Sequence, residues 1–66
     1  MQQTKAEILK ELGEKVRLAR KKRMLTQQDL ANLTKNRQAA ISNIERGVNT
    51  GSVFLVSVLK KLNVKV

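Results

Sequence analysis

The 66-residue chain has no cysteine, histidine or proline, and Phe54 is its one aromatic residue. Without cysteine or histidine it cannot form disulfide bonds, thiolate or imidazole metal sites, or a histidine general base. Its five carboxylates could supply only an unpaired acid or base. We therefore predict that the protein is not an enzyme and binds no metal or cofactor. The lack of proline favours helices. Because aromatic residues are nearly absent, the core must be aliphatic.

Acidic residues are also scarce, and they are unevenly placed. Lys and Arg number 14 against five Asp and Glu, so the formal net charge is +9. Residues 1–14 hold two basic and three acidic groups, whereas residues 15–66 hold twelve basic and two acidic groups. This excess indicates a polyanionic partner, either a nucleic acid or an anionic membrane surface. The alternative is a cationic surface that only aids solubility.

Long apolar runs are missing as well. The longest, Val53 to Leu59, is interrupted by Ser57 and falls short of the roughly 18 residues that span a membrane. The polar start from Gln2 to Lys5 does not fit a secretory signal. We expect one small domain over residues 1–66, in the cytoplasm and associated with the nucleoid. A chain this short is marginally stable unless it is compact or dimeric.

The apolar pattern predicts an all-α fold, a compact bundle of four to five short helices. The first helix should begin at Thr4, which has capping-box spacing to Glu7, and should end near Arg23. Thr26 and Asp29 repeat that spacing at the start of a second helix that ends near Thr34. The residues expected to face inward on these helices are Ile8, Leu12, Val16, Ala19, Leu30 and Leu33.

A third helix is expected over about residues 37–46, with Asn36 as its cap and Gly47 as its stop. Ala40, Ile41 and Ile44 form its inward face. A fourth helix should begin at Ser52 or Thr50 and end at Asn63, and apolar residues nearly encircle it. Such a wide apolar surface suggests contacts with both its own core and a second subunit, in a dimerisation region over about 53–66. This region includes a short strand-like tail at residues 64–66. The predicted dimer contacts are Val56, Leu59, Val64 and Val66.

Residues 26–46 therefore read as a helix-turn-helix unit whose second helix has polar side chains on its outer face. Amide side chains there can bond adenine, and a small apolar side chain can contact a thymine methyl group. The alternative is that these positions are ordinary solvated ones. The predicted base contacts are Arg37, Gln38, Ala39, Ser42 and Asn43. The predicted phosphate contacts are Thr26, Gln27, Asn36, Arg46, Thr50 and Ser52.

Two segments carry a family resemblance. Residues 18–31 contain Thr-Gln-x-x-Leu-Ala, and residues 40–47 contain Ile-Ser-x-Ile-Glu-x-Gly. At this spacing the chain resembles the Cro/repressor (XRE) type helix-turn-helix family over about residues 12–64. The resemblance implies a lambda-repressor-like bundle that binds a palindromic double-stranded DNA operator as a homodimer. It also implies that Gln27 braces Gln38, and that Arg20 and Glu45 form a structural ion pair.

The turn departs from the family pattern. The family usually has a glycine, a small apolar residue and a Ser or Thr cap where this chain has Lys35, Asn36 and Arg37. The usual proline before the fourth helix is also missing. The turn geometry is therefore the part that the resemblance predicts least well.

Within the family, the long first helix and the C-terminal residues are most similar to HipB-type antitoxins, which regulate their own expression and bind a toxin. A phage-type repressor or a restriction-modification controller would share the other features. Two rival functions remain: a protein-interaction module with DNA binding secondary, and a membrane-surface peptide that uses the basic first helix. The basic groups of that helix do not gather on one face, which disfavours the membrane.

Overall fold

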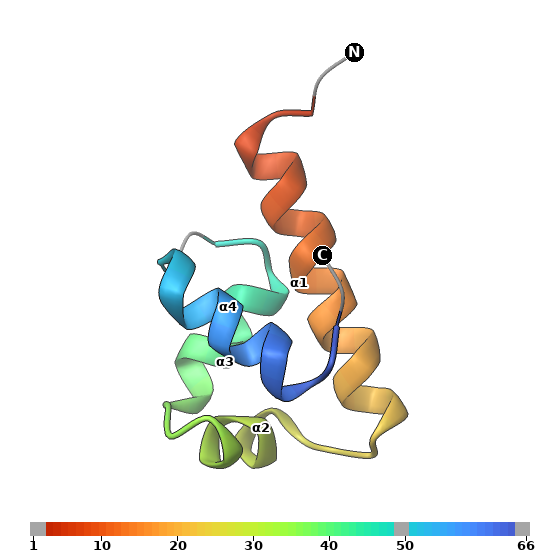
Figure 1. Ribbon diagram of the computed structural model, residues 1–66, viewed down its shortest axis with the longest axis vertical. Helices are drawn as coiled ribbons and strands as arrows, with labels where there is room; N and C mark the ends of the chain where they lie inside the picture. The colour runs from red at the N-terminus through yellow and green to blue at the C-terminus, as the bar shows by residue number, and fades with distance from the viewer. Residues whose placement is uncertain (1–2, 49–50, 65–66) are drawn as a thin grey trace.

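In the computed structural model, which describes residues 3–48 and 51–64, the chain forms four α-helices (Figure 1). They are α1 (Lys5–Lys22), α2 (Gln27–Leu33), α3 (Gln38–Glu45) and α4 (Ser52–Lys61). No strand occurs within those two stretches. The predicted all-α fold is therefore confirmed. The expected strand-like tail falls mostly outside the described residues, and Val64 is not in a strand.

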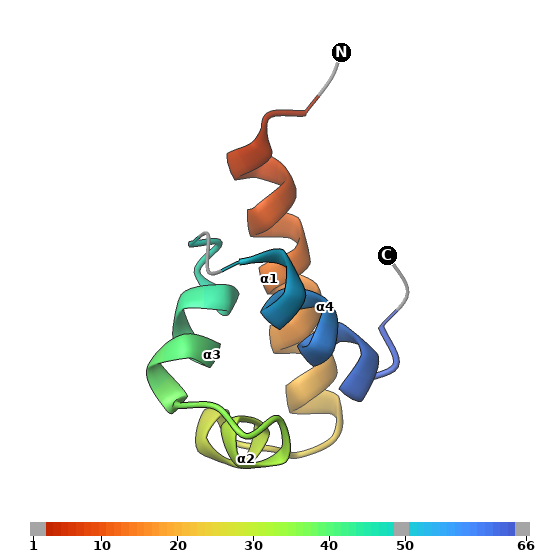
Figure 2. The same ribbon diagram turned by 60° about the vertical axis from the view of Figure 1, so that its left-hand side comes forward.

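The other three helices lie together on one side of the C-terminal half of α1. The first turns of α1 extend beyond them, as both ribbon views show (Figures 1 and 2). The ends of α1 and α4 are joined by a hydrogen bond of 3.2 Å from Arg23 Nη2 to the carbonyl oxygen of Leu62. Every helix contributes to one aliphatic core, whose largest fully buried side chains are Val16, Leu30, Ile41 and Val58.

Local sequence signals explain how the first two helices begin. The Thr4 and Thr26 side chains accept the backbone N–H groups of Glu7 and Asp29, and the two carboxylates accept the N–H groups of the two threonines. Each reciprocal pair satisfies two amides that have no partner within the helix, which stabilises the helix by about 1 kcal/mol. Both predicted capping boxes are therefore present.

Two residues that were expected to face the core are largely exposed. Ile8 is 44% exposed in the first turn of α1. The first turns of this helix extend past the other helices. Leu33 is 49% exposed in the last turn of α2, where the chain turns away toward α3. Helical periodicity correctly predicted the stripe but not how much of it the neighbouring helices cover.

The turn between α2 and α3 corrects another prediction. Asn36 does not cap α3: the N-cap is Arg37, which makes no side-chain capping bond. Asn36 instead donates from Nδ2 to the carbonyl oxygen of Thr34 at 2.7 Å, which ties it to the end of α2. The left-handed residue here is Lys35, with φ 57°. A non-glycine residue in that conformation costs about 1–2 kcal/mol.

Candidate nucleic-acid interface

A nearly buried ion pair fixes the end of α3 to α1. Arg20 Nε donates to Glu45 Oε2 at 2.7 Å, and Arg20 Nη2 donates to Glu45 Oε1 at 3.2 Å. Arg20 Nη1 also donates to the carbonyl oxygen of Leu25 at 2.7 Å, which holds the loop before α2. The two side chains therefore meet as the resemblance implies. The hydrogen bonds of Arg20 to Glu45 and Leu25 give it a structural role.

The same carboxylate extends the network to α2 and to the outer side of α3. Gln27 Nε2 donates to Glu45 Oε1 at 3.2 Å. Gln38 Nε2 in turn donates to Gln27 Oε1 at 3.4 Å. Glu45 therefore orients Gln27, and Gln27 orients the exposed Gln38. An amide that is oriented before binding loses less side-chain entropy when it meets a ligand.

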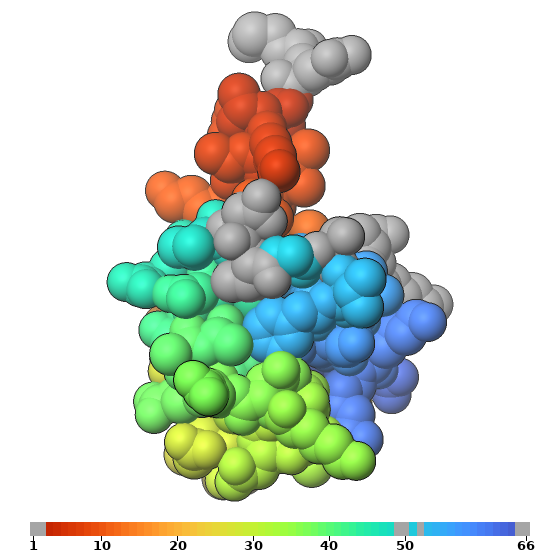
Figure 3. Space-filling model, turned by 90° about the vertical axis from the view of Figure 1, so that its left-hand side faces the viewer, coloured from red at the N-terminus to blue at the C-terminus, as the bar shows by residue number. Residues whose placement is uncertain are grey.

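The residues predicted to contact bases lie along the outer side of α3, opposite Ile41 and Ile44. Those two isoleucines are buried and anchor the helix in the core. Gln38 and Ala39 are exposed, whereas Ser42 and Asn43 are half-buried. We call these four residues the polar face of α3. Figure 3 presents this side of the molecule, with α3 beside the start of α4 and α2 below it.

The residues predicted to contact phosphate lie around that face. Arg46 is exposed at the C-cap of α3, and its Nη2 donates to Asn43 Oδ1. Thr26 and Gln27 are at the start of α2, and Asn36 is in the turn. Thr50 lies outside the described residues, and Ser52 is described only by its backbone, as the first residue of α4.

The predicted dimer contacts need one correction. Leu59 is only 3% exposed because it packs in the core of its own chain, so it offers almost no surface to a second subunit. Val64 is half-buried against the same core, and Val66 lies outside the described residues. Val56 is 46% exposed. Val53, which lies in the predicted dimerisation region but was not among the predicted contacts, is 82% exposed one turn earlier on α4.

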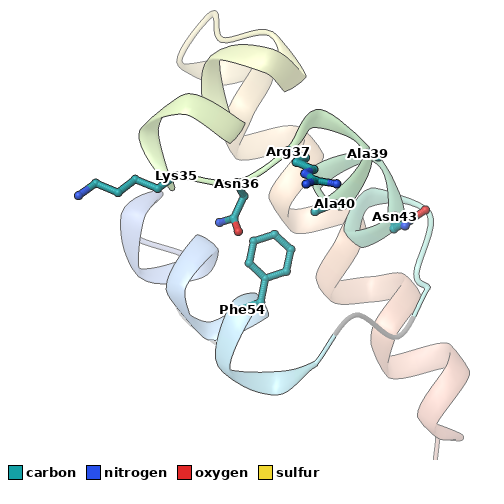
Figure 4. A pocket seen from close by; sticks show the side chains of 7 residues that line it. All are labelled: Lys35, Asn36, Arg37, Ala39, Ala40, Asn43 and Phe54. Carbon is teal, nitrogen blue, oxygen red and sulfur yellow. The ribbon is translucent and has the colours of Figure 1, made fainter.

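Two residues near the polar face were also missed. Lys35 and Phe54 line a cavity of about 560 Å³ between the α2–α3 turn, α3 and the start of α4 (Figure 4). We call this cavity the Phe54 pocket. Ala39 and Asn43 of the polar face line it as well. Lys35 could have been noticed because it stands where the family usually has glycine. Nothing in the sequence indicated that Phe54 lies beside it.

The capping bonds shift the ionisation of one acid. The Thr26 backbone amide, and secondly the Thr26 hydroxyl, hold the pKa of the Asp29 carboxyl below its ordinary value. Hydrogen bonds to a carboxylate favour its charged form. Asp29 is therefore a charged helix cap at neutral pH.

Within residues 3–48 and 51–64, no group of three or more potential metal-ligating side chains gathers at one place. In the same part of the chain, no helix has the length and hydropathy needed to cross a bilayer.

The helix-turn-helix family matches residues 16–66, which include the C-terminal part of α1 and all of α2, α3 and α4. No curated protein sequence matches the chain. The match covers most of the chain, and the geometry has the features of a DNA-reading helix: a buried apolar side, an oriented glutamine and flanking cations. The chain belongs to the XRE-type helix-turn-helix family, and it is a regulator that binds double-stranded DNA.

Proposed function

We propose that this protein recognises a specific palindromic operator as a homodimer and represses transcription there, without any chemical step. The observation that carries the proposal is the chain of contacts from Glu45 through Gln27 to Gln38. It orients an amide on the exposed side of a helix whose other side is anchored in the core. A bound dimer would block the polymerase at the promoter, in association with the nucleoid.

The polar face of α3 would enter the major groove. Gln38 and Asn43 carry the donor and acceptor that match N6 and N7 of adenine, and the Ala39 methyl group suits a thymine methyl. Ser42 can donate to an acceptor or accept from a donor on a base edge. Arg37, the fifth predicted base contact, stands at the N-cap of α3, just before this face begins.

Phosphate contacts at the edges of the face would set its register. Arg46, at the C-terminal end of α3, donates to Asn43 and forms no ion pair with any other described residue. Thr26 and Gln27 at the start of α2, Asn36 in the turn, and Thr50 and Ser52 around the start of α4 complete the proposed set. Such contacts supply affinity that falls with salt but little sequence preference.

Dimerisation would place two copies of α3 about 34 Å apart, in successive major grooves. The exposed Val53 and Val56 on α4 support this arrangement, because a second subunit that covered these apolar side chains would remove them from water. Val64 and Val66 would extend the contact.

The test begins with selection of a preferred duplex from random sequences. Gln38→Ala should then weaken binding to the selected duplex by about 1–3 kcal/mol and relax the preference at one base position. Gln28→Ala is the matched control, since Gln28 is exposed on α2 and its side-chain amide donates to Asn32 of the same helix. An equal loss on selected and random duplexes would contradict base readout by Gln38.

A second candidate is a protein-interaction module of the HipB type, an antitoxin that binds a toxin and for which DNA binding is secondary. The exposed apolar residues of α4 favour it, because they could equally be covered by a different protein. In that case selection should return no preferred duplex, and affinity should change little with salt. A steep salt dependence together with a defined site would favour the repressor.

A further inference from the structure

The α2–α3 turn carries two cations at positions where local stability favours other residues. Lys35 adopts φ 57°, a left-handed conformation in which glycine has no steric cost. Arg37 is the N-cap of α3 but makes no side-chain capping bond, whereas Ser, Thr, Asp or Asn would make one. Its positive charge also lies at the positive end of the helix dipole. Both residues therefore weaken the turn, which suggests that they serve another purpose.

That purpose is not an ion pair within the described part of the chain. The two ion pairs found there join Arg17 to Glu14 and Arg20 to Glu45. Asp29 is occupied by the cap of α2, and the remaining acids lie on the first half of α1. Lys35 and Arg37 are both exposed. An anion from outside the chain could neutralise these two positive charges.

The Phe54 pocket lies directly beside these cations. In Figure 4, Phe54 and Asn36 lie in its middle, Lys35 stands at one end with its side chain pointing outward, away from Phe54, and Arg37 and Asn43 lie toward the other end. The pocket thus combines an apolar ring with two cations on either side of it at the rim. Because Ala39 and Asn43 also line it, DNA held on the polar face of α3 would run past it.

We propose that the Phe54 pocket binds the backbone of one DNA strand, with Lys35 and Arg37 each neutralising a phosphate and Phe54 contacting the deoxyribose between them. A DNA strand alternates anionic phosphates with apolar sugar surface, and the pocket alternates the complementary groups. Arg37 then contacts phosphate and not a base edge. The proposal rests on the proposed DNA binding, and it adds an anchor at the N-terminal end of α3, opposite Arg46.

The turn offers two variants that separate binding from folding. Lys35→Gly removes a cation and relieves the left-handed strain, and Arg37→Ser removes a cation and supplies a helix cap. Each should raise the Tm, and the increase should be at most about 4–8 °C. Each should nevertheless weaken binding to a random duplex and lower the magnitude of the slope of log K against log[salt] by about 0.9.

Lys15→Gln is the matched control, since Lys15 is exposed on α1, a helix that supplies none of the residues lining the pocket. It removes the same charge and should leave the slope nearly unchanged. If Lys35→Gly and Arg37→Ser bind with the wild-type slope, the pocket does not neutralise phosphate and the proposal is wrong. If Lys15→Gln lowers the slope equally, only net charge matters, and the proposal is again wrong.

Phe54→Trp tests the sugar contact directly, because the chain has no other tryptophan. Its fluorescence should shift or be quenched when a duplex of random sequence is added. Unchanged emission, under conditions where fluorescence anisotropy of the labelled duplex reports binding, would overturn the role of Phe54. Failure of the wild-type protein to bind any duplex would instead overturn the proposed function itself.

Discussion

Gly13 of α1 lies against the backbone of Ile44 in the last turn of α3. A Cβ atom placed on Gly13 would be 2.1 Å from the carbonyl oxygen of Ile44 and 3.1 Å from that of Glu45. Contact distances this short leave room only for hydrogen. The helix that carries the polar face is therefore held at a spacing from α1 that a glycine makes possible.

Gly13→Ala should therefore destabilise the protein, although alanine is the better helix former by about 1 kcal/mol. The added methyl group meets backbone atoms that cannot rotate away, so α1 and α3 must separate. We expect a net loss of about 1–3 kcal/mol in the free energy of unfolding, measured by urea denaturation. Lys15→Ala, at an exposed position of the same helix, should change it little. A more stable Gly13→Ala variant would contradict the close packing.

Glu45→Gln should destabilise the protein more strongly. It leaves the nearly buried Arg20 guanidinium without its counter-charge and also weakens the support of Gln27. Removing one partner of such a pair costs about 3 kcal/mol. Replacing both Arg20 and Glu45 with methionine should cost less than the single change, because no unpaired charge remains. A double variant less stable than Glu45→Gln would show that the pair itself is strongly stabilising.

Asp29→Asn should lower the Tm at neutral pH, because it removes the charged cap of α2. Since the pKa of Asp29 is lower in the folded than in the unfolded protein, its ionisation stabilises the fold above the ordinary aspartate pKa. That contribution is lost as the pH falls through the folded-state pKa. The Tm difference between wild type and variant should therefore shrink in acid. A difference that is constant across the titration would exclude this linkage.

The exposed valines of α4 allow a test of the dimer. Val53→Asp and Val56→Asp place charges on its surface and should shift the sedimentation mass from dimer to monomer without unfolding the chain. Leu59→Asp is the contrasting variant, because it places a charge in the core and should unfold the protein. A wild-type protein that sediments as a monomer at all concentrations would contradict the homodimer.

How far the sequence predicts the site depends on the range of the interaction. The cap residues Thr4 and Thr26 act within one helical turn, so their spacing alone predicts them. The meeting of Arg20 with Glu45, 25 residues apart, was expected only from the family resemblance. The left-handed conformation of Lys35 and the N-cap position of Arg37 were missed, because the path of the chain into α3 decides which turn residue takes each place.

The sequence by itself determined the helical class, the basic character of the chain and the order of the polar and apolar sides of α3, because each follows from composition or from a 3.6-residue period. The tertiary structure decided which apolar residues are covered. Leu59 is inside and Val53 outside, although both lie on the same apolar helix. It also brought Phe54 beside Lys35. Burial and proximity depend on how helices pack against one another, and periodicity within a single helix carries no information about that.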